Sequence, residues 1–273
     1  GGNGMVAVNI MAVTQLYETY VKTACAAGVD AIISGAGLPT ELPKFAEGYN
    51  VALAPIVSST KSANVILKFW DKKYHRTADF LVIEGPLAGG HLGFSKEQLE
   101  DIPSLDYDTE IQNIIALKQT YEEKYQTTIP VFVAGGMFTA KDAAHVMELG
   151  ADGIQAATRF VATEECDASD AYKQAYVNAS DEDVIIIKSP VGMPGRAIKN
   201  AFIERMLAAP DKISHCFNCL KACNPATAPY CITQALINAV VGDLDNGLIF
   251  CGSRVGEITK ITTVPKLMQE LTV

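Results

Sequence analysis

The chain has 273 residues, of which 49% are hydrophobic and 19% are charged, and its formal net charge at pH 7 is -9. This composition is typical of a folded globular protein, with room for one large domain or two small ones, and it excludes a disordered chain. The acidic balance disfavours nucleic acid and anionic membrane surfaces as partners, because clustered Lys and Arg bind both. A small molecule is therefore the expected ligand.

The apolar runs and the cysteines indicate where the protein works. No run approaches the roughly 20 apolar residues of a transmembrane helix. The short apolar run Met5–Met11 has no basic segment before it, so no signal peptide is expected. The seven cysteines are odd in number and four lie close together near the C-terminus, which suits reduced thiols or a metal better than a disulfide framework. The sequence predicts a cytoplasmic protein.

Six short β-rich runs alternate with segments of helical character, which is the pattern of parallel βα units. The runs are Met5–Met11, Ala31–Ser34, Val51–Val57, Phe80–Glu84, Pro130–Ala134 and Gly153–Ala156. They are apolar at consecutive positions, as strands covered on both faces are. The sequence therefore predicts six parallel strands.

Three of these strands begin in the same way: a helical pattern ends, an Asp follows, and the strand starts. The residues are Asp30, Asp79 and Asp152. Gly28 and Gly150 stand where a left-handed helix C-cap is expected. The recurrence indicates one repeated supersecondary unit.

Small and polar residues gather where the predicted strands end. They form the segments Ser34–Gly37, Ser58–Lys61, Glu84–Pro86, Ala134–Met137 and Gln155–Arg159. A parallel αβ barrel has its active site at this end of the strands, and an open parallel sheet has its ligand crevice there. Because no Rossmann-type glycine fingerprint follows the first strand, we expect an α/β fold of the TIM (β/α)8 barrel type. Such a barrel has eight strands, so its first two βα units are expected to be missing from this sequence.

The character of the chain changes after Phe160. Asp167–Asp183 is polar and acidic, Val184–Lys188 is apolar, and Ser189–Arg196 is too rich in Gly and Pro to be a helix. The remainder, from Ala197 on, is expected to be mostly helical. We expect three regions: a barrel portion over residues 1–163, an active-site loop or lid over residues 164–200, and a small helical C-terminal cap over residues 201–273.

The last two predicted strands end in Ala134-Gly-Gly-Met137 and Gln155-Ala-Ala-Thr158. If these are the seventh and eighth strands of a barrel, their loops expose backbone amides at the usual phosphate site of that fold. A phosphorylated cofactor such as FMN fits this site, and a pair of tight turns without a ligand is the alternative. The sequence has no P-loop Lys-Ser/Thr pattern, which disfavours a nucleoside triphosphate.

His91 follows Gly89 and Gly90 in the loop after the fourth predicted strand. A histidine on a glycine loop at the ligand end of a sheet is suited to proton transfer, because the unperturbed pKa of imidazole is near 6.5. A structural histidine is the alternative. His75 and His145 lie on predicted helices and are expected at the surface.

Four cysteines near the C-terminus have the spacing C-x2-C-x3-C-x7-C. They are Cys216, Cys219, Cys223 and Cys231. Thiolates at such spacing can bind one metal ion or an iron–sulfur cluster. Free thiols packed within a helical cap are the alternative.

Taken together, several segments resemble the nitronate monooxygenase (2-nitropropane dioxygenase) family, which is related to the FMN-dependent enoyl-ACP reductases. They are Val8–Met11, Ser34–Gly37, Glu84–His91, Ala134–Gly136, Gly150–Gln155 and Thr158–Phe160. The resemblance implies a TIM barrel that carries FMN, a small helical second domain, and the oxidative denitrification of nitronates or nitroalkanes with O2. It also implies that His91 is the catalytic base, which takes the α-proton of a nitroalkane or positions its nitronate. The expected cofactor-binding residues are Asn9, Ser34, Glu84, Gly85, Gly89, Gly90, Gly135, Gly136, Gln155, Ala156, Ala157 and Thr158.

Ala157 stands where the family usually has glycine, and an alanine can still donate its backbone N–H to a phosphate if φ is negative there. Two alternatives to the nitronate activity stay open. One is an NAD(P)H-dependent FMN reductase of enoyl-ACP or quinones, and the other is a flavin or metal sensor without enzymatic activity. A homodimer is expected because the cap is apolar.

Overall fold

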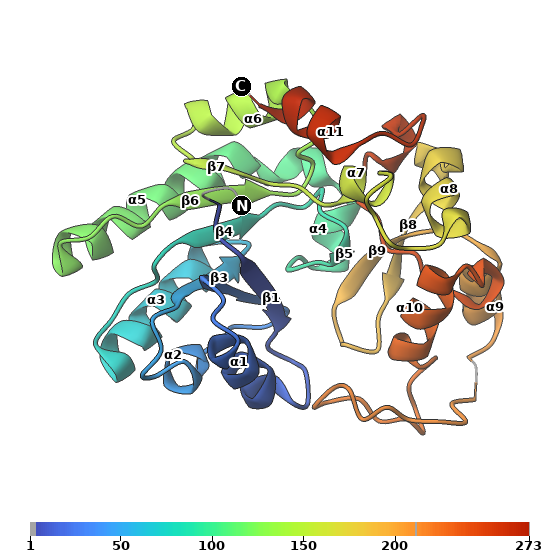
Figure 1. Cartoon of the computed structure of the whole chain (residues 1–273), viewed down its shortest axis with the longest axis horizontal. Helices are drawn as coiled ribbons and strands as arrows, with labels where there is room; N and C mark the ends of the chain where they lie inside the picture. The colour runs from blue at the N-terminus through green and yellow to red at the C-terminus, as the bar shows by residue number, and fades with distance from the viewer. Residues whose placement is uncertain (1–3, 211, 273) are drawn as a thin grey trace. The chain divides into compact units, whose positions relative to one another are not determined.

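A computed structural model describes residues 4–210 and 212–272. The chain divides into two compact units, and Figure 1 shows their elements in chain order. Unit 1 contains the residues up to Gly85 together with Pro103–Ala134 and His145–Gln155. Unit 2 contains Pro86–Ile102, Gly135–Ala144 and the residues from Ala156 onward.

Unit 1 is built on six parallel strands in the order β1-β2-β3-β4-β6-β7, which form a half-barrel with β1 and β7 at its edges. The strands are β1 (Ala7–Met11), β2 (Ala31–Gly35), β3 (Ala52–Val57), β4 (Leu81–Glu84), β6 (Val131–Ala134) and β7 (Gly153–Gln155). Every strand begins and ends within two residues of its predicted run. The predicted α/β class and the parallel sheet are therefore confirmed.

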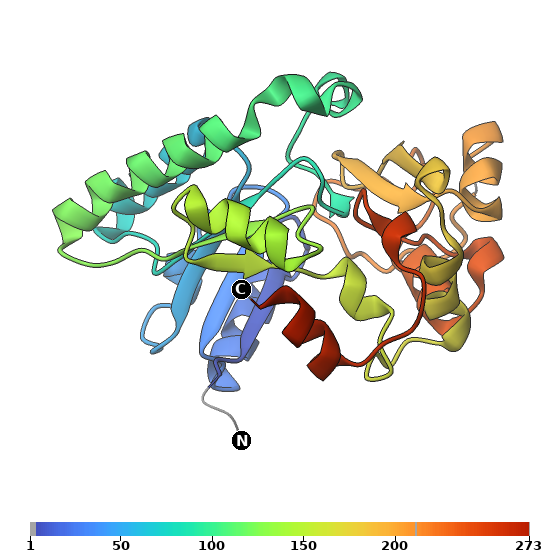
Figure 2. The same ribbon diagram turned by 90° about the horizontal axis from the view of Figure 1, so that it is seen from above.

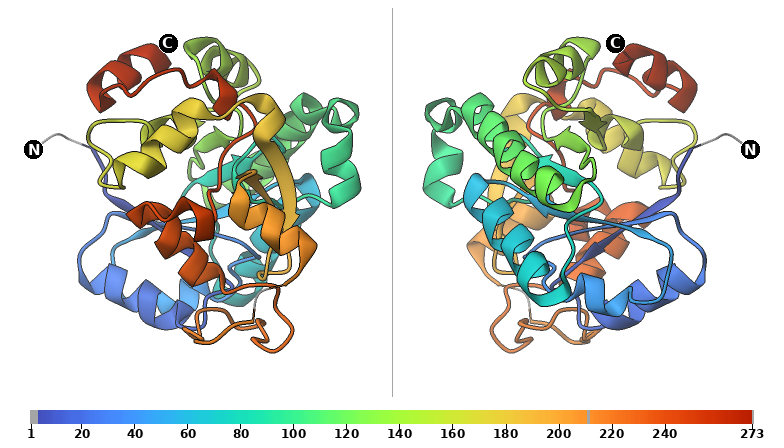
Figure 3. Two further views of the ribbon diagram at one scale, coloured as in Figure 1. Left: turned by 90° about the vertical axis from the view of Figure 1, so that its right-hand side faces the viewer. Right: turned by 90° about the vertical axis from the view of Figure 1, so that its left-hand side faces the viewer.

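Helices cover one face of the half-barrel (Figure 3, right). They are α1 (Tyr17–Ala26), α2 (Leu42–Phe45), α3 (Thr60–Tyr74) and α5 (Tyr107–Tyr125), while α6 (Ala140–Glu148) contributes residues to both units. Figure 2 shows α5 running alongside α3, whose Trp70 is fully buried and donates its indole N–H to the carbonyl of Pro39 over 3.2 Å. Among the described residues no helix is both long and apolar enough to cross a lipid bilayer.

The three Asp residues at the strand starts join neighbouring strands. The Oδ2 atoms of Asp30, Asp79 and Asp152 accept the backbone N–H groups of Val6, Leu53 and Val131 over 2.7, 2.7 and 2.8 Å. In return, the backbone N–H groups of Asp30, Asp79 and Asp152 donate to the carbonyls of Val6, Leu53 and Val131, respectively. Each Asp therefore fixes the start of its own strand to the start of the strand before it, and the predicted repeat is confirmed. Gly28 and Gly150 have φ of +77° and +103°, as a left-handed C-cap requires.

Unit 2 contains a small antiparallel sheet in the order β5-β9-β8. Its strands are β5 (Gly90–His91), β8 (Val184–Lys188) and β9 (Pro194–Ile198). The prediction of a loop over Ser189–Arg196 was wrong at its C-terminal end, where β9 begins. Pro194 is the first residue of that strand, a position at which a missing backbone N–H is tolerated. Gly192, with φ +88°, closes the turn by donating to the carbonyl of Ser189.

The helices of unit 2 are short. They are α4 (Lys96–Glu100), α7 (Thr158–Val161), α8 (Asp170–Asn178), α9 (Ala201–Ala208), α10 (Ile232–Val241) and α11 (Val264–Leu271), with 3-10 turns η2 (Asp181–Asp183), η3 (Leu244–Asn246) and η4 (Val255–Glu257). A further 3-10 turn, η1 (Ile102–Leu105), has residues in both units. Figure 3 (left) shows α8, α9 and α10 beside the β8–β9 hairpin. The described residues of 209–231 contain no helix, so the four clustered cysteines lie in an irregular segment and at the start of α10.

Candidate active site

His91 lies on β5, a strand of only two residues that pairs with β9. The Nε2 atom of His91 is 2.8 Å from Oγ of Ser189, which is 2% exposed and lies in the turn between β8 and β9. The Ser189 hydroxyl also accepts the backbone N–H of Val191 over 3.3 Å. The serine is therefore held in place by its own turn and fixes the imidazole ring in one orientation.

An aromatic ring covers His91 from another side. The ring centroids of His91 and Phe250 are 5.0 Å apart with the planes at 67°. A Cβ atom at Gly195, the residue paired with His91, would lie 3.0 Å from the Phe250 ring, so glycine leaves room for that ring. Burial among these groups lowers the pKa of His91 to about 4. The imidazole is consequently neutral at pH 7, the form that can accept a proton.

The glycines before His91 serve the protein backbone. A Cβ atom at Gly89 would lie 2.5 Å from the carbonyl carbon of Cys251, so only glycine permits this approach of two chain segments. Gly90 has φ +68°, in the left-handed region that favours glycine. The buried guanidinium of Arg196, which pairs with Gly90 across the sheet, donates to the carbonyl of Ala88. These contacts fix the backbone that leads into the histidine.

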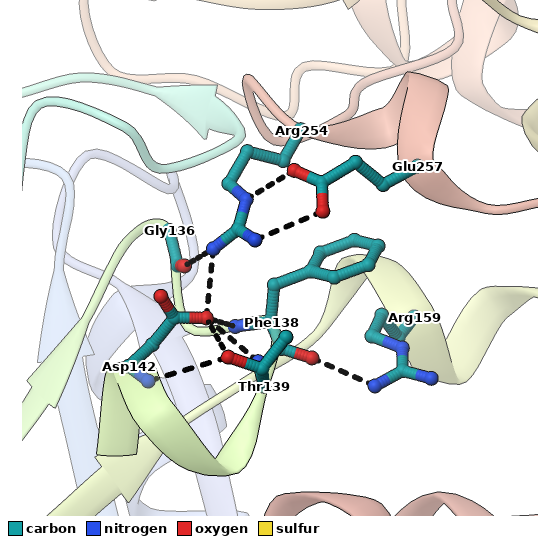
Figure 4. Close-up of polar contacts among 7 residues, drawn as sticks. All are labelled: Gly136, Phe138, Thr139, Asp142, Arg159, Arg254 and Glu257. Carbon is teal, nitrogen blue, oxygen red and sulfur yellow. Dashed lines mark hydrogen bonds and ion pairs between the residues drawn. The ribbon is translucent and has the colours of Figure 1, made fainter. Parts of the chain in front are cut away.

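The first predicted phosphate loop, Gly135-Gly136, directly follows β6 in the sequence. Both glycines have positive φ, +90° and +84°. Figure 4 shows how Arg254 anchors this loop: its Nη1 donates to the carbonyl of Gly136 over 3.1 Å and to Oδ2 of Asp142 over 2.7 Å. The same carboxylate oxygen accepts the backbone N–H of Phe138 and of Thr139, so one arginine and one aspartate hold the whole turn.

Two guanidinium groups lie against the ring of Phe138. The Cζ atoms of Arg159 and Arg254 are each 4.9 Å from its centroid. Arg159 also donates to the carbonyl of Phe138 over 2.7 Å, and Arg254 forms an ion pair with Glu257 (Figure 4). Cation–π contacts of this kind add to the hydrogen bonds that order the loop.

The second predicted phosphate loop, Ala156–Thr158, leads into the four-residue helix α7. Ala157 has φ -136°, so the condition that its φ be negative is met. The Oγ1 atom of Thr158 accepts the backbone N–H of Gly252 over 3.0 Å. The segment Gly252–Arg254 therefore contacts both predicted phosphate loops. Gly252 bonds to Thr158 of the second loop, and Arg254 bonds to Gly136 of the first.

Between these two anchor points lies Ser253, whose buried Oγ has no hydrogen-bond partner among the described residues. A buried hydroxyl without a partner is costly unless a ligand or a water satisfies it. Phosphate oxygens are acceptors of the kind that a hydroxyl and backbone N–H groups bind. The residues present therefore fit the phosphate of a cofactor such as FMN.

The remaining predicted cofactor residues lie on the strands of unit 1 or directly after them. Asn9 is exposed on β1, and Gln155 is partly buried at the end of β7. Ser34 is fully buried, where its hydroxyl donates to the carbonyl of Ile10 and bonds to the hydroxyl of Tyr17, each over 2.7 Å. The Ser34 hydroxyl is thus used within the half-barrel.

Glu84 and Gly85 end β4 beside Tyr107. The Tyr107 hydroxyl donates to the backbone carbonyl of Glu84 over 2.9 Å, and a Cβ atom at Gly85 would lie 3.0 Å from the tyrosine ring. Burial raises the pKa of the Glu84 carboxyl to about 7. At neutral pH this side chain exists in both protonation states, which is a property of groups at functional sites.

The four clustered cysteines are free thiols that line one small pocket. Burial, followed by the nearby thiols of Cys219, Cys216 and Cys231, raises the pKa of the Cys223 thiol. Within the described part of the chain, however, no group of three or more His, Cys, Asp or Glu side chains is placed so that it could hold a metal ion. The two predicted surface histidines, His75 and His145, are indeed exposed.

Sequence reasoning missed the partners of the predicted residues. Ser189 and Phe250 are 98 and 159 positions from His91, and Gly252–Arg254 lies far along the chain from both loops that it anchors. The only local signal was composition: Ser189 stands in a segment rich in Gly and Pro, and Cys251-Gly-Ser-Arg254 has the small residues of a functional loop.

Known proteins share this fold. The structure superposes on FabK from Thermotoga maritima with a TM-score of 0.75 and 25% sequence identity, over 99% of this chain and 75% of that one. It also superposes on a nitroalkane oxidase from Streptomyces ansochromogenes with a TM-score of 0.65 and 20% identity, over 93% of this chain and 66% of that one. The second likeness shows the fold alone.

Sequence relatives agree with the fold. A Staphylococcus saprophyticus protein described as "probable nitronate monooxygenase" is 32% identical over 135 residues, which are 50% of this chain and 36% of that protein. The match thus spans about a third of that relative's length. The family model for nitronate monooxygenase matches residues 2–273, nearly the whole chain. The chain therefore belongs to the nitronate monooxygenase family of flavin-dependent oxidoreductases.

Proposed function

We propose that this chain catalyses the oxidation of nitronates or nitroalkanes with O2, as an FMN-dependent nitronate monooxygenase. The observation that carries the proposal is His91, a neutral imidazole held by Ser189 beside Phe250. A nitroalkane loses its α-proton to a base when it becomes a nitronate. His91 would accept that proton, or hydrogen-bond to the nitronate, while Phe250 limits access of water to the ring.

FMN would supply the redox centre that takes electrons from the substrate and passes them to O2. We propose that its phosphate is bound by Gly135, Gly136 and the loop from Ala156 to Thr158, with the Ser253 hydroxyl as an additional donor. The rest of the cofactor would contact the remaining residues expected from the sequence. They are Asn9, Ser34, Glu84, Gly85, Gly89, Gly90 and Gln155.

The alternative function is an NAD(P)H-dependent FMN reductase of enoyl-ACP or of quinones. The likeness to FabK favours it, at 25% identity over 99% of the chain. The two activities differ in the electron donor, so anaerobic stopped-flow mixing of the FMN-loaded protein separates them. Flavin bleaching by a nitronate should be faster than bleaching by NADH or NADPH, and the reverse order would replace the monooxygenase with the reductase.

The role of His91 has its own test. His91→Gln should lower kcat by roughly 100-fold or more, the usual contribution of a general base, with FMN still bound. A nitronate that is supplied already deprotonated should restore much of the activity if His91 acts as a base. A variant equally slow with both substrates would assign His91 to binding the nitronate.

We propose that the half-barrel is part of a closed (β/α)8 barrel in which two further strands join the edges at β1 and β7. The β1 edge supports this proposal, because Met5 and Val6 beside it are each 64% exposed. Unpaired apolar edges are sites of further strand pairing. The intact mass of the protein from its natural source should exceed the 29.2 kDa of this chain, and an equal mass would count against closure.

The assembly and the setting are also proposed. Helix α10 exposes the apolar side chains Leu236, Ile237, Val240 and Val241 on one face, which suits contact with a second copy in a homodimer. Light scattering after size exclusion should give a molar mass twice that of the chain. The Val241→Lys variant should have the molar mass of a single chain. The expected partners are the small-molecule substrate with O2 or NAD(P)H and not nucleic acid, in a cytoplasmic setting.

A further inference from the structure

The irregular segment between α9 and α10 brings four cysteines to one place. A pocket of about 70 Å³ is lined by the side chains of Cys216, Cys219, Cys223 and Cys231 together with apolar neighbours such as Leu220 and Ile232. All four thiols are free, and three of them are partly buried. Four of the seven cysteines in the chain thus surround a space smaller than a substrate needs.

The backbone around the first two cysteines has a feature that a simple loop does not require. Asn218 is in the left-handed region, with φ +50°, and its backbone N–H points at Sγ of Cys216 over 3.3 Å. A thiol sulfur is a weak hydrogen-bond acceptor, whereas a metal-bound thiolate keeps negative charge and accepts backbone N–H groups well. The turn thus provides a donor for a charged sulfur.

The length of the segment is a second, independent reason. The described residues of 209–231 contain no helix, and structureless segments longer than about 12–15 residues are uncommon in compact domains unless they are functional or cross-linked. Among the described residues 212–230, the backbone N–H groups of Thr227 and Ala228 donate to the carbonyl of Asn224, which makes one local turn. A metal bound by four of its side chains would supply the missing constraint.

We propose that Cys216, Cys219, Cys223 and Cys231 bind a thiophilic metal centre that orders this segment. Each thiol would release its proton and bind the metal as a thiolate, with no change in oxidation state. The four thiols as they stand do not form a metal site, so binding would require the cysteine side chains to rearrange. A zinc ion and an iron–sulfur cluster share this ligand set.

Metal analysis of the full chain, purified without oxygen or chelators and freed of flavin, tests the proposal and separates the two metals. One zinc per chain without visible absorption, or iron and sulfide in equal amounts with visible absorption, would each support it. Metal-free protein that binds neither added Zn2+ alone nor iron with sulfide under reducing conditions would overturn it.

Variants identify the ligands. Cys219→Ser and Cys223→Ser should each lose the metal, whereas Cys166→Ser, at a partly buried thiol outside the pocket, should keep it. Retention of the metal by both cluster variants would also overturn the proposal. FMN binding reports whether each variant is folded, because the proposed phosphate loops lie outside the segment.

The turn at Asn218 provides a finer test. Asn218→Gly keeps both the N–H and the positive φ, so its metal affinity should equal that of the wild type. Asn218→Val disfavours that φ and should weaken metal binding by about 10-fold or more, the usual effect of losing an outer-shell partner. Equal affinities of the two variants would contradict the proposed N–H to thiolate bond.

Discussion

The charge of His91 depends on its burial. The pKa of its imidazole is about 4 in the folded protein, whereas a histidine in an unfolded chain titrates near 6.5. Above pH 6.5 neither state is protonated, and the folded state has its full stability. As the pH falls from 6.5 toward 4, the unfolded chain takes up a proton that the folded protein refuses, so stability is lost.

The first prediction follows from this sign. Between pH 7 and pH 4 the wild type should lose up to about 3 kcal/mol more unfolding free energy than His91→Gln, which cannot be protonated and can still reach Ser189. Urea denaturation at several pH values measures the difference. His75→Asn serves as the control, because it removes an exposed histidine at a left-handed position that asparagine tolerates. If the unfolding free energies of the wild type and His91→Gln changed in parallel with pH, burial would not lower the pKa of His91.

The second prediction concerns the close packing of the backbone at Gly89. Gly89→Ala places a methyl group within 2.5 to 2.7 Å of the backbone of Cys251 and Gly252, which cannot move as a flexible side chain can. We expect a loss of at least about 1–3 kcal/mol in unfolding free energy, measured in urea. Gly4→Ala, where no atom lies within 4 Å of the added methyl group, should change it little. An equal loss of unfolding free energy in the two variants would contradict the close approach of Gly89 to the backbone of Cys251 and Gly252.

The sequence alone was enough to select those single residues whose role depends on their neighbours in the chain. Gly28 and Gly150 were identified because a left-handed C-cap depends on neighbours within one helical turn. His91 was selected as a candidate because its glycine loop follows a strand, and its catalytic role stays a prediction. Ser189 and Arg254 were not, because a hydrogen bond across 98 or 118 positions leaves no pattern in one sequence.

Asp30, Asp79 and Asp152 are the side chains that join neighbouring strands of the parallel sheet. Each carboxylate accepts an N–H at the start of the preceding strand, so it sets the register of two parallel neighbours. These residues are exposed, so a single bond should contribute about 1 kcal/mol.

The third prediction tests this contribution. Asp152→Ala should lower the unfolding free energy by about 1 kcal/mol and speed amide exchange at Val131, whose N–H loses its acceptor. Asp167→Ala, at an exposed Asp with no hydrogen bond to the residues that the structure describes, should change neither. If Val131 exchanged at its wild-type rate in Asp152→Ala, the carboxylate would have no role in strand pairing.

The second sheet marks the limit of prediction for elements. Six parallel strands were found because each is a run of mostly apolar residues bounded by turn residues. Strand β5 has only two residues and β9 begins with Pro-Gly, so neither carries a periodic signal. Strand β9 exists because it pairs along its whole length with β8, and β5 exists because Gly90 and His91 pair with Arg196 and Gly195, which is a tertiary contact.

For the whole molecule, the α/β class and the family were accessible from the sequence, because glycine loops at strand ends are local and occur together. That the two proposed phosphate loops both bind Gly252–Arg254 could be learned only from the structure. That convergence also makes the cofactor proposal testable without any assay of activity.

The last prediction concerns the response of the molecule to its cofactor. FMN at 100 times its dissociation constant should raise the unfolding free energy by about 2.7 kcal/mol, because only the folded chain binds it. Hydrogen exchange should slow at the backbone amides of Gly136 and Thr158, where the phosphate would bind. Riboflavin, which lacks the phosphate, should stabilise the protein less and leave these amides unprotected. Equal protection by both ligands would place the phosphate elsewhere, and no stabilisation by FMN would remove the basis of the proposed chemistry.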